Sequence, residues 1–114
     1  MELKELKDYL KIVRCKYKDF KTSNWFDVEY ETDEDQCSLE FCYDYKKDKY
    51  ACYVSVYHAS EDNNAEYPEN HTDEEVYYDA DLESLVNRIK DQYGERFFEE
   101  FNKELKRWQV LNLN

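Results

Sequence analysis

The chain has 114 residues, of which 41% are hydrophobic and 18% aromatic, and it carries a formal net charge of −12. This length fits a single domain over residues 1–114, and the apolar content is enough to build a core, so the charge does not imply disorder. No apolar run approaches the roughly 18 residues of a membrane span, and the charged N-terminus lacks a signal-peptide core. We therefore expect a cytoplasmic protein that does not contact a membrane.

An amphipathic helix is the first predicted element. Leu3, Leu6, Leu10 and Val13 recur at three-to-four spacing with lysines between them, which is the pattern of a helix with one apolar stripe. A polar cluster at residues 22–24 is suited to a turn, so we expect the helix to end before it.

Three segments of alternating polar and apolar residues follow the helix. They cover residues 26–31, 38–45 and 50–57, and an alternation of period two is typical of strands. Residues 32–36 and 46–49 are predicted turns between them.

The second of these turns predicts how the second and third strands pair. A four-residue hairpin loop would bring the apolar residues of both strands together on one face, whereas a slip by one residue would separate them. In the same register His58 lies opposite Cys37. The expected apolar pairs are Tyr43 with Cys52, Phe41 with Val54, and Leu39 with Val56.

The rest of the chain predicts a loop, a short strand and two helices. Residues 59–73 form a polar, acidic loop, and residues 75–79 form a short fourth strand at the edge of the sheet. Asp81 is a candidate N-cap for a helix that ends or bends at Gly94. The apolar stripe of this helix comprises Leu82, Leu85, Val86, Ile89 and Tyr93, and that of a last helix comprises Phe97, Phe98, Phe101, Leu105 and Trp108.

These elements predict an α+β fold with an antiparallel sheet of three to four strands, in the order α-β-β-β-(β)-α-α. Each helix has one apolar stripe, and an antiparallel sheet can leave one face in water. We expect all helices on the face that carries Phe41 and Val54. The opposite face, with its carboxylates and with Tyr53 and Tyr57, is expected to meet solvent.

The four cysteines are the first candidates for chemistry. Cys15, Cys37, Cys42 and Cys52 contain no C-x-x-C pair, so neither a zinc knuckle nor a thioredoxin-type site is indicated. We interpret them as free and mostly buried thiols of a reducing compartment. A nucleophile made of Cys37 or Cys52 with His58 is an open alternative, although a structural thiol near a strand-end histidine explains the same residues.

Carboxylate-rich segments are the second candidates. Residues 32–35 and 79–81 offer oxygen ligands for a divalent cation, but neither has the glycine-bearing twelve-residue spacing of an EF-hand loop. The single glycine of the chain leaves no phosphate-binding loop. We therefore predict no metal, no cofactor, no catalytic residue and no enzymatic activity.

The acidic residues are concentrated in the middle of the chain. Residues 1–22 carry a net charge of +3 and residues 87–114 a net charge of +1, whereas residues 23–86 hold three Lys/Arg and nineteen Asp/Glu, a net charge of −16. A nucleic-acid binder needs a basic footprint, so direct binding of nucleic acid is not expected. Concentrated acid instead favours a basic protein as partner. A charged surface kept for solubility is the alternative.

The predicted first strand presents a regular row of carboxylates. Asp27, Glu29 and Glu31 project from one face at about 6.6–6.8 Å intervals, twice the strand rise. Such a row is comparable to phosphates along a nucleic-acid backbone and would suit a groove lined by Arg and Lys, with tyrosines adding apolar contact area. The predicted partner-binding residues are Asp27, Glu29, Glu31, Asp33, Glu34, Asp35, Glu40, Asp44, Tyr53, Tyr57, Glu61, Asp62, Glu66, Glu69, Asp73, Glu74 and Glu75.

Small size, strong acidity, tyrosine richness and the element order from Leu3–Val13 to Phe97–Trp108 together carry a resemblance. In these respects the chain resembles the phage-encoded anti-CRISPR proteins and other DNA-mimic inhibitors. The resemblance is one of architecture and composition without a shared motif, so no site residue carries over. It implies an inhibitor that occupies the DNA-binding or PAM-reading groove of an RNA-guided nuclease, which reads its target through arginines.

Other functions fit the same pattern. The first alternative is an immunity protein or antitoxin that plugs a basic toxin nuclease, and the others are a different binding module and the thiol enzyme. The oligomeric state is open, because an exposed sheet face that carries tyrosines could pair with itself.

Overall fold

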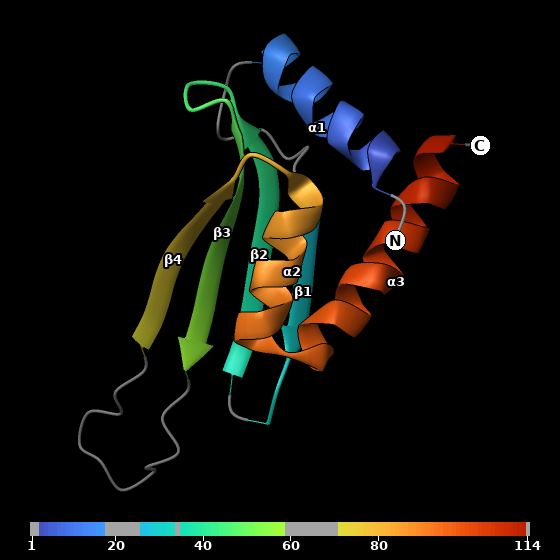
Figure 1. Ribbon diagram of the computed structural model, residues 1–114. Coiled ribbons are helices and arrows are strands. Elements are labelled where there is room, and N and C mark those ends of the chain that lie inside the picture. Colours follow the sequence, from blue (N-terminus) through green and yellow to red (C-terminus); the bar gives the residue numbers. More distant parts are fainter. Residues whose placement is uncertain (1–2, 18–25, 34, 59–70, 114) are drawn as a thin grey trace, which may run out of the picture.

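The computed structural model describes residues 3–17, 26–33, 35–58 and 71–113. Figure 1 shows a four-stranded antiparallel sheet and three helices, which is the α+β fold that the sequence predicts. None of the described helices is long and apolar enough to cross a membrane. In chain order the elements are α1 (Lys4–Tyr17), β1 (Phe26–Glu31), β2 (Asp35–Asp44), β3 (Lys49–His58), β4 (His71–Asp79), α2 (Leu82–Tyr93) and α3 (Glu95–Leu113).

The sheet is a meander with helices on one face. The strands lie in the order β1-β2-β3-β4, so each pairs with its neighbour in the sequence. Leu6 of α1, Ile89 of α2 and Phe101 of α3 belong to one core cluster with Leu39 and Val54 of the sheet. All three helices therefore pack on the predicted face, and no described helix covers the opposite one, which we call the open face (Figure 1).

Aromatic side chains join the sheet to α3. The ring centroid of Phe101 lies 5.5 Å from that of Phe41 and 5.3 Å from that of Phe26, both in edge-on contacts. Phe41, Phe97 and Phe101 are fully buried, and burial of such a side chain contributes roughly 1.5–3 kcal/mol. This aromatic cluster fixes α3 against β1 and β2.

The ends of α2 follow the predicted signals. Asp81 is extended, and its carboxylate accepts a hydrogen bond from the backbone N–H of Ser84 at 3.0 Å, as an N-cap does. A 2.9 Å ion pair from Lys7 to Asp81 ties α1 to this cap, and this hydrogen bond together with that from Ser84 lowers the pKa of Asp81. Gly94 ends α2 with φ of 87°, a conformation that glycine adopts without steric cost.

The pairing of β2 with β3 differs by two residues from the prediction. Phe41 lies opposite Cys52, and Leu39 lies opposite Val54, so the predicted pairs were wrong. The apolar face is unchanged, because a shift by an even number of residues keeps every side chain on its side of the sheet.

The turn between these strands explains the shift. It comprises residues 45–48, whereas 46–49 were predicted. The carboxylate of Asp44 accepts hydrogen bonds from the backbone N–H groups of Lys46 and Lys47, at 3.0 and 3.2 Å. Asp48 adopts a positive φ of 52°, which Asp tolerates better than most residues. The side chains of the turn therefore set where it closes.

β4 is longer than predicted. It begins at His71 and pairs with β3 along its whole length, so the prediction of a loop over residues 71–73 was wrong. The remainder of that predicted loop, residues 59–70, lies outside the described residues.

Candidate functional site

Five carboxylates gather on the open face, and we call them the open-face carboxylates. β1 contributes three, β2 one and β4 one, because alternate residues of a strand point to the same side. Asp27 lies directly opposite Glu40, and Glu29 lies in line with Glu74 across the two intervening strands. The five are Asp27, Glu29, Glu31, Glu40 and Glu74.

One of the open-face carboxylates, Asp27, is repelled by its acidic neighbours. In the described part of the chain, no Lys or Arg forms an ion pair with any of them. The pKa of Asp27 is raised from 3.8 to about 6, first by partial desolvation and then by repulsion from Glu40, Glu29 and Glu104. Among the described residues, the single hydrogen bond to the Glu31 carboxylate is a 3.4 Å one from the side-chain amide of Gln36. A cationic partner would relieve this repulsion.

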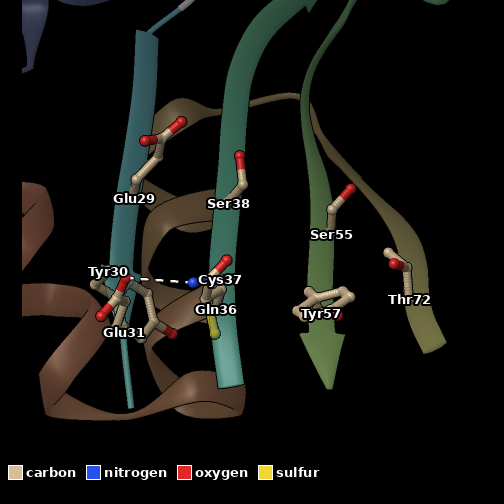
Figure 2. A pocket seen from close by; sticks show the side chains of 9 residues that line it. All are labelled: Glu29, Tyr30, Glu31, Gln36, Cys37, Ser38, Ser55, Tyr57 and Thr72. Atoms are coloured by element: carbon tan, nitrogen blue, oxygen red, sulfur yellow. Dashed lines mark hydrogen bonds between the residues drawn. The ribbon is translucent and has the colours of Figure 1, made fainter. Parts of the chain in front are cut away.

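A pocket of about 480 Å³ opens beside Glu29 and Glu31. Figure 2 shows that all four strands of the sheet contribute side chains to it, with carboxylates on β1 and hydroxyl groups on the other three strands. The pocket therefore offers hydrogen-bond acceptors and an aromatic ring within one recess. The lining residues on β2, β3 and β4 include Ser38, Ser55, Tyr57 and Thr72.

Apolar surface lies among these polar groups. Tyr57 is 37% exposed and Val76 is 44% exposed. Tyr53 is directly opposite Val76, in the row of Asp27 and Glu40. Both tyrosines were predicted at this surface but Val76 was not, although the alternation of β4 from its observed start at His71 places it there.

Asp44 and Asp33 do not join the open-face carboxylates. Asp44 is only 4% exposed, and its carboxylate is used by the β2–β3 turn. Asp33 is exposed in the turn between β1 and β2. Five more predicted residues, Glu34, Glu61, Asp62, Glu66 and Glu69, lie outside the described residues.

The other three predicted acids lie on the side of the sheet that the helices cover. A pocket of about 390 Å³, which we call the end pocket, opens there between the strand ends and the last turn of α2. Its lining includes Asp35 of β2, Asp73 and Glu75 of β4, and Tyr93 of α2. The prediction that these acids extend the open face was therefore wrong.

His58 bridges two of the end-pocket acids. Its Nδ1 lies 2.6 Å from Oδ1 of Asp35, and its Nε2 lies 2.9 Å from Oδ2 of Asp73. Only the imidazolium form can donate from both nitrogens. The hydrogen bond to Asp35, followed by that to Asp73, raises the pKa of His58. The bridge joins β2, β3 and β4.

Glu75 is also partnered within the end pocket. The hydroxyl of Tyr77 donates to its carboxylate, and the hydroxyl of Tyr93 lies 3.5 Å from the same oxygen. Burial, followed by hydrogen bonding, raises the pKa of both phenols. All three end-pocket acids are therefore used inside the fold.

The register does not place Cys37 directly opposite His58, as was predicted, although both residues line the end pocket. His58 lies opposite Asp35, and Cys37 lies opposite Val56. Cys37, Cys42 and Cys52 are buried thiols, and burial raises the pKa of Cys37 and Cys52. A buried thiol with a raised pKa is a poor nucleophile.

A metal centre is likewise not formed by the residues that the structure describes. Within them, no group of three or more His, Cys, Asp or Glu side chains is arranged to hold an ion. Asp81 serves as a helix cap, and Asp35 pairs with His58. At least one acid of each segment that could have offered cation ligands is thus engaged in the fold.

Comparison of the chain with protein-family models, with curated proteins and with solved structures found no match.

Proposed function

We propose that this protein works by binding and not by catalysis, as an acidic inhibitor that places its open face in the basic nucleic-acid groove of a nuclease. An RNA-guided CRISPR effector is the target class that fits best, since arginines in its groove read the DNA. In this proposal the open-face carboxylates stand in for phosphates.

The grouping of the open-face carboxylates carries the proposal. Neighbouring acids on β1 are about 6.6–6.8 Å apart, close to the spacing of every second phosphate on one strand, which carries one charge per ~3.4 Å. After partial desolvation, repulsion from Glu40 and Glu29 contributes to the raised pKa of Asp27. Repulsion of this kind lowers stability unless a partner relieves it.

The open-face pocket supports arginine as the contacting group. Glu29 and Glu31 can accept from a guanidinium, whose planar fork matches a carboxylate. Tyr57 borders the same pocket and offers a ring for stacking. A solubility surface requires neither the recess nor the exposed tyrosine.

Capture from an extract of the host, followed by competition, tests the proposal. The tagged protein is expected to retain a basic nuclease, identified by mass spectrometry, and duplex or single-stranded DNA is expected to displace it. An immunity or antitoxin role would be indicated if that nuclease is a toxin encoded beside the protein. A captured partner that has no nucleic-acid site, or that nucleic acid does not displace, would contradict the proposal.

A further inference from the structure

β4 forms one edge of the sheet, and β1, which runs next to α3, forms the other (Figure 1). α2 contacts β4 at its C-terminal end, where Arg88 meets Tyr78 and Asp79. α3 holds β1 through the contact of Phe101 with Phe26 and through Arg96, which lies 5.6 Å from the ring centroid of Tyr30. An edge strand presents backbone N–H and C=O groups with which another chain can pair. β4 is the strand where this opportunity exists.

The direction of the β4 backbone can be read from one hydrogen bond. The carbonyl of Tyr78 accepts from Nη1 of Arg88 at 2.6 Å, so it points away from β3. Because this direction alternates along a strand, the backbone groups of Val76, Glu74 and Thr72 point outward as well. Among the described residues, no backbone group bonds to these three from outside the sheet. They form a row of donors and acceptors ready for a further strand.

The side chains of β4 define what can pair with it. Asp73, Glu74, Glu75 and Val76 are consecutive and all exposed. A second copy of β4 would bring two such acidic runs together, and like charges on adjacent strands are destabilising. The edge therefore selects against self-pairing and for a strand of positive charge.

We infer that β4 binds an extended basic segment of a partner protein, which adds a fifth strand to the sheet. In an antiparallel addition, the segment carries an apolar residue opposite Val76, followed by basic residues opposite Glu75, Glu74 and Asp73. The basic residue opposite Glu74 lies on the open face, and its two neighbours lie on the helix side. The inference concerns the edge alone and does not rest on the proposed function.

A capped peptide, Ser-Thr-Val-Arg-Lys-Arg-Thr, is the probe for this edge. It is expected to bind and to slow hydrogen exchange at the amides of Glu74 and Val76. Methylation of the backbone nitrogen of its Lys, which faces β4, is expected to weaken binding about tenfold, because the hydrogen bond donated by this N–H is lost while the charges remain. The matched control carries the methyl on the nitrogen of the following Arg, which faces away, and is expected to bind like the parent peptide.

Equal binding of the parent and of both methylated peptides would overturn the inference, because charge alone would then explain it. Protection of β1 amides in place of β4 amides would overturn it too. A dimer in sedimentation, with Glu74 and Val76 protected in the absence of peptide, would identify a second copy as the occupant and reject the basic segment.

Two variants of Val76 test the same edge from the side of the protein. Val76→Pro removes an outward N–H, which an edge strand tolerates, and is expected to weaken binding of the parent peptide about tenfold. Val76→Thr keeps the N–H and is expected to bind within about twofold of the native chain. Unchanged binding by a folded Val76→Pro variant would contradict the inference. If that variant does not fold, the methylated peptides decide the question on the native protein.

Discussion

The open face and the end pocket both gather carboxylates, but they use them differently. In the end pocket Asp35 and Asp73 face the two nitrogens of His58, and Glu75 accepts from tyrosine hydroxyls. On the open face, no described Lys or Arg pairs with the carboxylates, and Asp27 is held at a raised pKa. The hydrogen-bonded acids of the end pocket stabilise the fold, whereas the charged form of Asp27 on the open face lowers its stability. The two regions therefore differ in how their acids are partnered, and not only in how many acids they contain.

Charge reversal on the open face should have the largest effect. The triple variant Asp27→Lys, Glu29→Lys, Glu31→Lys is expected to bind the captured nuclease at least about a hundredfold more weakly, since three attractive contacts become repulsive. Titration calorimetry with the purified partner measures the loss.

A variant with the same net charge isolates position from charge. Glu83, Asp91 and Glu99 are exposed on the helices, so their reversal to Lys changes the total charge equally without touching the sheet. It is expected to bind within a few-fold of the native chain, roughly the effect of distant charges. If both triple variants lost the same affinity, the open face would contribute to binding only through the net charge of the protein.

Salt should weaken binding through the open face by a smaller factor. Between roughly 50 and 200 mM salt, affinity is expected to fall about tenfold or more, as for contacts that replace phosphates. The helix triple variant should keep the slope of the native chain, and the open-face triple variant should lose most of it. A flat response in the native protein would indicate an apolar interface instead.

Asp27→Asn should raise stability at neutral pH. The folded pKa of about 6 exceeds the ordinary 3.8, so the native state binds more protons between these values and loses stability as pH rises through that window. After discounting for solvent screening, the gain at pH 7 is on the order of 1 kcal/mol, and it should vanish below pH 3.8. Urea unfolding at the two pH values measures it. A loss of stability at neutral pH would show that the carboxylate has a favourable partner.

The same titration should act on binding with the opposite sign. A basic partner stabilises the charged form of Asp27, so affinity should increase as pH rises from 5 to 7. The Asp27→Asn variant should lose this part of the pH dependence while Glu29 and Glu31 retain the contact. If the native protein bound its partner better at pH 5 than at pH 7, Asp27 would not be part of the interface.

His58→Gln tests the end pocket and should have the smallest effect. The folded pKa of His58 is raised above 6.5, so its stabilisation is fully present below 6.5 and is lost as pH rises through the raised value. The urea midpoint of the native chain should fall over that window, and the variant should show a weaker fall. Binding of the partner should not change. If His58→Gln weakened binding as much as the open-face triple variant does, the end pocket and the open face would have to be parts of one binding site.

Helices, strands and their faces could be predicted from periodicity. The stripe of Leu82, Leu85, Val86 and Ile89 is fully buried as expected, because spacing alone places these residues on one side of a helix. The alternation of β1 likewise put Asp27, Glu29 and Glu31 on the exposed side. The row of carboxylates on β1 could therefore be predicted from the sequence.

The strand register and the end pocket could not be predicted from the sequence. Registers two residues apart give the same apolar face, and the choice between them depends on how Asp44 and Asp48 fold the turn. That choice decides that His58 meets Asp35 instead of Cys37. In β4 the run of Asp73, Glu74 and Glu75 looks like one acidic segment, yet alternation sends its members to opposite faces.

The meander order has a kinetic consequence. Every strand pairs with the strand that precedes it in the chain, so the sheet can grow one hairpin at a time with little loop entropy lost at each step. Such local connectivity favours rapid folding among sheet-containing domains. A newly made copy would therefore present its acidic row soon after synthesis.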